Sequence, residues 1–82
     1  MPYYLYLLRC ADNTLYAGIT TDLARRVEEH NLSTKGAKYT RARRPVVLAY
    51  SRCYKSRSEA TKAEMAIKKL TRVEKLCLLK GV

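Results

Sequence analysis

A guanidinium and an imidazole are predicted to lie together on one face of a short helix. Arg26 and His30 are four residues apart, and the apolar residues Leu23 and Val27 repeat with the same spacing. Side chains four apart share a helix face, so we expect both polar groups at the border of the buried stripe. A guanidinium can donate charge-assisted hydrogen bonds to a phosphate, and an imidazole can relay a proton near neutral pH. Both residues are therefore candidates for chemistry. The alternatives are a surface position for Arg26 and a helix-capping role for His30.

The segment before this helix predicts how it is positioned. Residues 15–19 form a short strand that we expect to break at Gly18, which has no Cβ. Thr20, Thr21 and Asp22 are all good N-cap types, and they mark the start of the helix. The helix is expected to end near His30 or Asn31, so the strand and the helix pack as consecutive elements.

The rest of the chain predicts an α+β fold in one domain, residues 1–82, with the element order ββαβαα. A three-stranded antiparallel sheet would be flanked by helices. Residues 3–10 are apolar on both alternating faces, which is typical of a strand covered on both sides. The other predicted elements are a strand over 46–54, a helix from 57 to about 70, and a last helix that begins after 71.

The charge of the chain favours a polyanionic partner. Seventeen Lys and Arg against seven Asp and Glu leave a formal net charge of +10. Nucleic acid is the commonest partner of such a surface. A solubilising surface or an acidic protein partner are the alternatives. The three cysteines form no Cys-x-x-Cys or Cys/His cluster, so we expect small buried side chains in a reducing compartment. No signal peptide or membrane span is predicted, which indicates a cytoplasmic protein.

Cations are concentrated in residues 32–45, a polar loop that can include one helical turn around Tyr39. These cations are Lys35, Lys38, Arg41, Arg43 and Arg44. Cations of this kind neutralise phosphates without reading sequence, and a tyrosine ring can stack on a base. The segment is therefore the predicted nucleic-acid grip, with a solvated basic loop as the alternative.

The sequence resembles GIY-YIG nuclease domains over essentially its whole length. Tyr6 corresponds to the tyrosine of the first half-motif, although no Gly-Ile precedes it, and residues 16–18 correspond to the second half-motif. Arg26 and His30 fall where the family keeps an arginine and a histidine or tyrosine, and Glu64 matches its metal-binding glutamate. The stretches 16–26 and 36–45 are similar to the small bacterial stand-alone branch of the superfamily. That branch lies near the catalytic domains of structure-selective endonucleases.

The resemblance implies roles for the aromatic and basic residues. Tyr6 would be the general base and Tyr16 its orienting partner, or the two roles would be reversed. Arg26 would face the scissile phosphate, and His30 would relay a proton or hold a tyrosine hydroxyl. Gly18 is expected to lie next to the catalytic tyrosines without taking part in the reaction itself.

The resemblance also implies one Mg²⁺ or Mn²⁺ site held by Glu64. A single carboxylate is sufficient where water and phosphate oxygens complete the Mg²⁺ shell. Without the family match, Glu64 is better explained as an exposed residue paired with Lys68 at i, i+4. With the match, Lys68 becomes a neighbour of the metal site. The family often has a further polar residue, usually Asn, beyond another strand, and the sequence after Glu64 predicts no such strand.

A site that uses both tyrosines constrains the first hairpin. A two-residue turn at Asp12-Asn13 would place Tyr6 and Tyr16 on opposite faces of the sheet, because faces alternate along each strand. We therefore predict an odd-length loop, or a bulge near Cys10 or Thr14.

These observations together predict a metal-dependent endonuclease that hydrolyses phosphodiester bonds in DNA, with a role in DNA repair or processing. The alternatives are a non-catalytic nucleic-acid-binding module that keeps the fold, or a subunit of a larger complex that supplies targeting. The choice between DNA and RNA stays open from the sequence.

Overall fold

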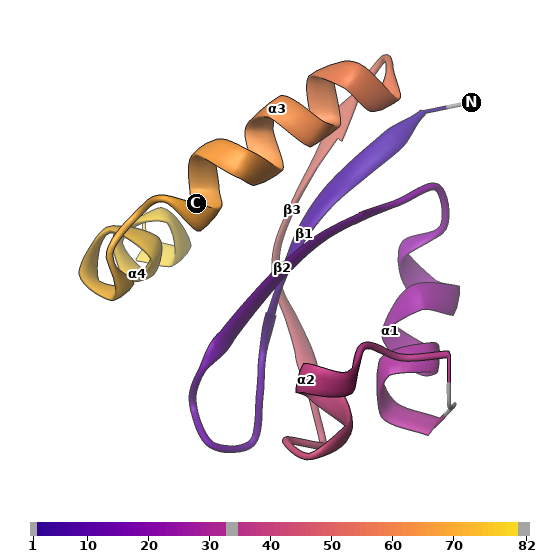
Figure 1. The fold of residues 1–82 in the computed structure, drawn as a ribbon, viewed down its shortest axis with the longest axis vertical. Coiled ribbons are helices and arrows are strands. Elements are labelled where there is room, and N and C mark those ends of the chain that lie inside the picture. The colour runs from indigo at the N-terminus through magenta and orange to yellow at the C-terminus, as the bar shows by residue number, and fades with distance from the viewer. Residues whose placement is uncertain (1, 33–34, 81–82) are drawn as a thin grey trace.

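The computed structural model describes residues 2–32 and 35–80 as a three-stranded antiparallel sheet with helices on both faces (Figure 1). The elements in chain order are β1 (Tyr3–Arg9), β2 (Leu15–Thr20), α1 (Leu23–Leu32), α2 (Lys38–Arg41), β3 (Val47–Tyr54), α3 (Arg57–Lys68) and α4 (Arg72–Lys80). The predicted α+β class and sheet are confirmed. The observed order is ββααβαα, because the helical turn expected around Tyr39 forms the short helix α2.

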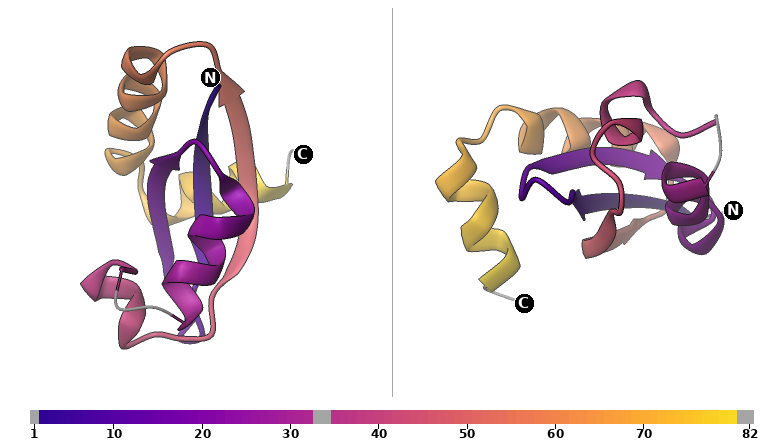
Figure 2. Two further views of the ribbon diagram at one scale, coloured as in Figure 1. Left: turned by 90° about the vertical axis from the view of Figure 1, so that its right-hand side faces the viewer. Right: turned by 90° about the horizontal axis from the view of Figure 1, so that it is seen from below.

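Strand β1 is the centre of the sheet, whose strand order is β2-β1-β3. Its residues Leu5, Tyr6, Leu7 and Leu8 are all buried, as predicted for a strand covered on both sides. In Figure 2, left, α1 lies in front of the strands and α4 lies behind them. The strand therefore contributes to two separate cores.

Each core is formed between one face of the sheet and its own helices. Leu5 and Leu7 pack with Ile67 of α3 and with residues of α4. Tyr6 and Leu8 point the other way and pack with the apolar residues of α1. The face that carries Tyr6 is thus the one on which α1 can place polar side chains.

The hairpin between β1 and β2 has the odd-length loop that the tyrosines require. Arg9 pairs with Leu15, and the Cys10 amide donates to the Thr14 carbonyl at 2.8 Å, which leaves three residues in the loop. Asn13 adopts a left-handed conformation with φ 68°, which asparagine tolerates better than most residues. The prediction of an odd-length loop is confirmed, and both tyrosines lie on the same face.

Side-chain caps fix the starts of the longer helices. The Asp22 carboxylate accepts from the Arg25 amide at 3.1 Å, and the Ser56 hydroxyl accepts from the Glu59 amide at 3.2 Å. At the start of α4, the Thr71 hydroxyl accepts from the Glu74 amide, and the Glu74 carboxylate accepts from the Thr71 amide in return. These are the caps that the sequence predicts, and they place α1 directly after β2.

The cysteines differ from the sequence prediction. Cys10 is buried, but Cys53 and Cys77 are exposed, and all three are free thiols. Both exposed residues lie on solvent-facing positions of a strand and a helix, so the expectation of three buried side chains was wrong. Among residues 2–32 and 35–80, no helix has the length and apolar character needed to cross a membrane.

The side-chain amide of Asn31, near the end of α1, forms two hydrogen bonds with the backbone of Val46, the residue before β3. Asn31 Nδ2 donates to the Val46 carbonyl at 2.9 Å, and the Val46 amide donates to Asn31 Oδ1 at 2.7 Å. Val46 is buried, so water cannot easily replace either bond. This pair fixes the distance between α1 and the sheet.

We predict that Asn31→Ala lowers the free energy of unfolding by about 1–3 kcal/mol, because it leaves a buried amide and carbonyl without partners. Urea unfolding measures the change. Glu28→Ala, an exposed change on the same helix, is the control and should have an effect within about 0.5 kcal/mol of zero. Equal losses in the two variants would contradict the anchoring role of Asn31.

Candidate active site

Tyr6 is the centre of a buried polar network on the α1 face of the sheet. Its side chain is 2% exposed, and its hydroxyl lies 3.0 Å from Nε2 of His30. Nε of Arg26 donates to the same oxygen at 3.4 Å. The strand β1 and the helix α1 therefore bring together three of the residues that the sequence predicts for catalysis.

Gly18 makes room for the Tyr6 ring. The two residues are paired across β1 and β2, and a Cβ on Gly18 would lie 2.5 Å from Tyr6 Cζ and collide with the hydroxyl. Its φ is not in the left-handed region, and β2 continues through it to Thr20. The expected strand break at Gly18 is therefore wrong, because the glycine is needed for space and not for a turn.

His30 is fully buried between Tyr6 and the residues that lead into α2. Its Nδ1 lies 2.8 Å from the Thr40 hydroxyl and 3.4 Å from the Ala37 amide. Burial, and then the positive charge of Arg26, lower the pKa of His30 to about 4, so the imidazole is neutral at pH 7. The alternative role of capping the α1 carbonyls belongs instead to Arg44, whose Nε donates to the His30 carbonyl at 2.6 Å.

Arg26 is held on its outer side by two acceptors. Its Nη1 donates to the Glu29 carboxylate at 2.9 Å and to the Lys35 carbonyl at 3.0 Å. Burial opposes the charged form, but the hydrogen bonds to Tyr6 and Glu29 raise the pKa of Arg26. The guanidinium is therefore oriented towards Tyr6, and the alternative of a surface arginine does not describe it.

Tyr16 belongs to a column of rings beside Tyr6. Its ring packs edge-on against His30, with centroids 5.3 Å apart, and is stacked with Tyr39 at 5.8 Å and 25°. The guanidinium of Arg43 lies over the Tyr39 ring, 3.9 Å from its centroid. The column connects the buried site to the exposed surface of α2.

Glu64 approaches the site from α3. Its side chain is only 18% exposed, and its carboxylate lies 3.6 Å from Nζ of Lys68. Burial, the largest effect, and the proximity of Tyr16 and Glu64 raise the pKa of Tyr6, whereas the hydrogen bond and charge of Arg26 lower it; the net direction is upward. Glu64 is thus close enough to affect the Tyr6 hydroxyl, and it also forms the ion pair that the simpler explanation predicts.

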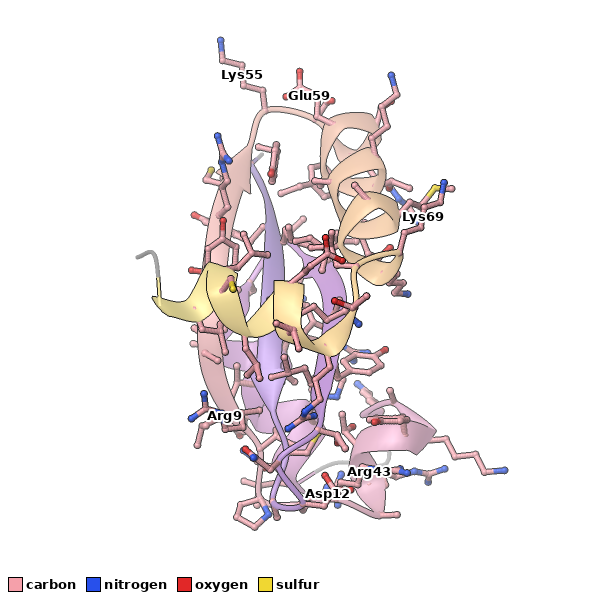
Figure 3. All side chains as sticks on the ribbon, turned by 90° about the vertical axis from the view of Figure 1, so that its left-hand side faces the viewer. Arg9, Asp12, Arg43, Lys55, Glu59 and Lys69 are labelled. Atoms are coloured by element: carbon pink, nitrogen blue, oxygen red, sulfur yellow. The ribbon has the colours of Figure 1, made fainter. Side chains whose placement is uncertain are left out.

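The cations of the predicted grip divide into two groups. Lys35, Lys38 and Arg41 are exposed. Arg43 forms an ion pair with Asp12 at 3.0 Å, as the side view of Figure 3 illustrates, and also donates to the Tyr39 carbonyl. Arg44 donates to the last carbonyls of α1. The exposed group is available to solvent, whereas the two arginines before Pro45 hold the segment against the hairpin and α1.

Sequence reasoning did not find two residues of this network. Glu29 stands three residues after Arg26, so helix spacing alone could have predicted their ion pair. Thr40 is fully buried, and its contact with His30 depends on how residues 35–41 fold back onto α1. No pattern in the sequence marks that contact.

The fold and the arrangement of tyrosines, arginine and histidine define a GIY-YIG domain. The family model described as the GIY-YIG catalytic domain matches residues 2–76. The chain belongs to this superfamily, within the UPF0213 family of small bacterial proteins.

Individual relatives support this assignment. A UPF0213 protein of Desulfotalea psychrophila is 55% identical over 79 residues, which cover 96% of this chain and 72% of that protein. One from Streptococcus agalactiae is 52% identical over 80 residues, covering 98% and 90%. The solution NMR structure of a UPF0213 protein from Bacillus halodurans is 42% identical, with a TM-score of 0.63 and coverage of 98% and 84%. That of an E. faecalis protein is 49% identical, with a TM-score of 0.67 and coverage of 99% and 85%.

The low pKa of His30 predicts how stability depends on pH. The unfolded imidazole binds a proton near pH 6.5, whereas the folded one does so only near pH 4. The folded state therefore has its full free energy of unfolding above pH 6.5, where His30 is neutral in both states. This free energy decreases as the pH falls towards 4, because only the unfolded imidazole then binds a proton. We expect the free energy of unfolding to fall by about 2 kcal/mol between pH 7 and pH 5.

Urea unfolding at the two pH values measures this loss. His30→Gln is the control, because the slope above pH 5 should disappear with the only histidine of the chain. An NMR titration of the His30 ring in the folded protein with a midpoint near 6.5 would contradict the prediction.

Proposed function

We propose that this protein is a metal-dependent endonuclease that hydrolyses phosphodiester bonds in DNA. One observation carries the proposal: Tyr6, Arg26 and His30 form one hydrogen-bonded group, with Tyr16 beside it and Glu64 within electrostatic reach. Burying a guanidinium edge, an imidazole and a phenol together is unfavourable unless they have partners. Their retention in a small core is explained by chemistry at the phenol oxygen.

Each residue has a defined part in the proposed reaction. Tyr6, ionised once the positive charge of a bound metal would offset its raised pKa, takes a proton from the attacking water. The hydroxide bonds to phosphorus as the P–O bond to the leaving sugar oxygen breaks, and that oxygen takes a proton from solvent water. Arg26 donates to the Tyr6 oxygen and so favours the phenolate. Its remaining N–H groups donate to the phosphate, on which negative charge grows in the transition state. Tyr16 packs against His30 and orients the network without a proton transfer of its own.

Glu64 fits a single Mg²⁺ site that substrate completes. Among the described residues, no three His, Cys, Asp or Glu side chains come close enough to form a protein-only metal cluster. Mg²⁺ needs only one or two carboxylates when water and phosphate oxygens fill its shell, and the partly exposed Glu64 supplies one. A bound Mg²⁺ would supply positive charge that neutralises the phosphate and favours ionised oxygens nearby. Mn²⁺ prefers similar oxygen ligands.

The exposed cations Lys35, Lys38 and Arg41 are proposed to hold the DNA backbone. Lys38 and Arg41 belong to α2 with Tyr39, which is 38% exposed, and Lys35 lies near Arg26, which donates to its carbonyl. Lysine and arginine bind phosphates independently of sequence, so this surface fits recognition of the backbone. In this proposal Arg43 and Arg44 shape the segment and do not contact the substrate directly.

The second candidate function is a nucleic-acid-binding module without catalysis. The observation that favours it is that both charged site residues already have intramolecular counter-ions. Arg26 pairs with Glu29 at 2.9 Å, and Glu64 pairs with Lys68 at 3.6 Å. An enzyme must exchange these partners for phosphate and metal, whereas a binding module can keep them.

We predict that Glu64→Gln abolishes cleavage while DNA binding persists, because the change keeps the size of the side chain and removes its charge. The assay compares labelled branched, single-stranded and duplex DNA, with Mg²⁺ and with a chelator. The expected loss of cleavage is at least about 100-fold. Glu59→Gln is the matched control, since Glu59 is exposed at the start of the same helix (Figure 3).

Undiminished cleavage by the Glu64 variant would contradict the proposal that Glu64 binds the metal. If the wild-type protein binds all three DNAs and cleaves none of them in Mg²⁺ or Mn²⁺, the binding module is the correct function.

Replacing Lys38 and Arg41 with alanine should weaken binding to all DNA sequences alike. Each phosphate that the protein no longer neutralises reduces the slope of log K against log salt by about 0.9, so we expect a change of up to roughly two. The matched control replaces the exposed Lys55 and Lys62, which removes the same charge from another part of the surface. Fluorescence anisotropy at several salt concentrations measures both. Equal changes of slope in the two variants would place the DNA elsewhere.

A further inference from the structure

The direction of one backbone amide determines which nitrogen of His30 carries the proton. A peptide N–H cannot rotate, because the peptide group is planar. The Ala37 N–H points at Nδ1 of His30 from 3.4 Å. If Nδ1 carried a hydrogen, two donors would face each other at this part-buried position. Nδ1 is therefore the acceptor, and in the neutral ring the hydrogen is on Nε2.

The Thr40 hydroxyl completes this arrangement. Its oxygen lies 2.9 Å from the Ala37 carbonyl, to which it can donate, and 2.8 Å from Nδ1 of His30, which can accept the same hydrogen instead. That carbonyl already accepts from the amides of Thr40 at 3.0 Å and Arg41 at 3.1 Å, which occupy its two lone pairs. The hydroxyl hydrogen is therefore better used on Nδ1, where it supplies the shorter of the two hydrogen bonds to this nitrogen.

We propose that Thr40 is a positioning residue that holds His30 in the Nε2–H tautomer, so that the imidazole donates a hydrogen bond to the Tyr6 oxygen. The catalytic consequence rests on the proposed nuclease function. The tautomer itself does not depend on that function.

The consequence of this tautomer lies at the Tyr6 oxygen. His30 Nε2–H donates to it at 3.0 Å and Arg26 Nε–H donates at 3.4 Å, so two hydrogen bonds from the protein end on one oxygen. Two such donors stabilise the phenolate and so oppose the burial that raises the pKa of Tyr6. When the phenolate accepts the proton of the attacking water, a neutral phenol forms and His30 keeps its own proton. The opposite tautomer would make His30 an acceptor and favour the protonated phenol.

The backbone around Thr40 is built to keep it against α1. A Cβ on Gly36 would lie 2.7 Å from the Glu29 carbonyl and 2.8 Å from His30 Cα, so only glycine allows this approach of the two segments. Thr40 and His30 are both fully buried, and water does not compete for Nδ1. The position of the hydroxyl is therefore set by the fold.

The test uses ¹⁵N NMR of the imidazole in the whole chain, where His30 gives the only histidine signals. In the wild type at pH 7, we expect a protonated, pyrrole-type Nε2 and an unprotonated, pyridine-type Nδ1. Thr40→Ser keeps the hydroxyl and should reproduce this spectrum. Thr40→Val keeps the shape and removes the hydroxyl, so its Nδ1 signal should shift away from the hydrogen-bonded position. Amide spectra show whether each variant is folded.

A protonated Nδ1 in the wild type would overturn the proposal, and this result does not require the valine variant to fold. An unchanged Nδ1 signal in folded Thr40→Val would also overturn it.

Cleavage kinetics separate this inference from the proposed function. Acid–base catalysis contributes roughly 10²–10⁴ in rate, and we expect Thr40→Val to lose at least about 10-fold in kcat with little change in KM. Thr40→Ser should restore most of that loss. If the tautomer is as predicted but the wild type cleaves no DNA, the nuclease function fails and the placement of Thr40 stands. If the wild type cleaves DNA and Nδ1 is protonated, the nuclease function stands and the role proposed for Thr40 fails.

Discussion

The hydrogen bond between the buried Tyr6 hydroxyl and His30 is the interaction on which the rest of this structure depends. Both groups are almost inaccessible to water, so each must find its partners within the protein. The surrounding sequence provides them: Gly18 leaves space for the phenol, Arg26 shares its oxygen, and Thr40 binds the far side of the imidazole. One polar pair therefore explains residues on two strands and two helices. The three-residue hairpin loop and the close approach at Gly36 serve the same network.

This arrangement relates the surface charge to the buried chemistry. The ring column continues from His30 through Tyr16 to Tyr39, where the exposed cations begin. The Arg26 guanidinium, whose orientation is fixed by Glu29 and Tyr6, lies at the buried end of this column, where Tyr6 meets His30. Because the arginine is oriented in advance, a phosphate that binds it has only to replace Glu29 as its partner. The counter-ion Glu29 also explains how a cation can remain half-buried in a small domain.

Local patterns were sufficient to predict most of the fold and part of the site. Capping residues and apolar periodicity predicted α1, α3 and α4, because these features depend on neighbours in the chain. The odd hairpin loop followed from strand parity only because the family resemblance required Tyr6 and Tyr16 in one site; Asp12-Asn13 alone would suit a two-residue turn. Contacts between distant segments could not be predicted in this way. Gly18 had the signature of a strand break, yet its purpose is the Tyr6 ring across the sheet. Arg44 was grouped with the grip, although its guanidinium binds the α1 carbonyls. Thr40 had no sequence signal at all.

The central claim is that the Tyr6 hydroxyl carries out chemistry and is not only a packing group, and Tyr6→Phe tests it most directly. The variant removes one oxygen and keeps the ring that fills the core. Single-turnover cleavage of branched DNA in Mg²⁺ should fall by at least about 100-fold, while amide NMR spectra and DNA affinity stay close to those of the wild type. Cleavage at the wild-type rate by a folded Tyr6→Phe protein would contradict the account.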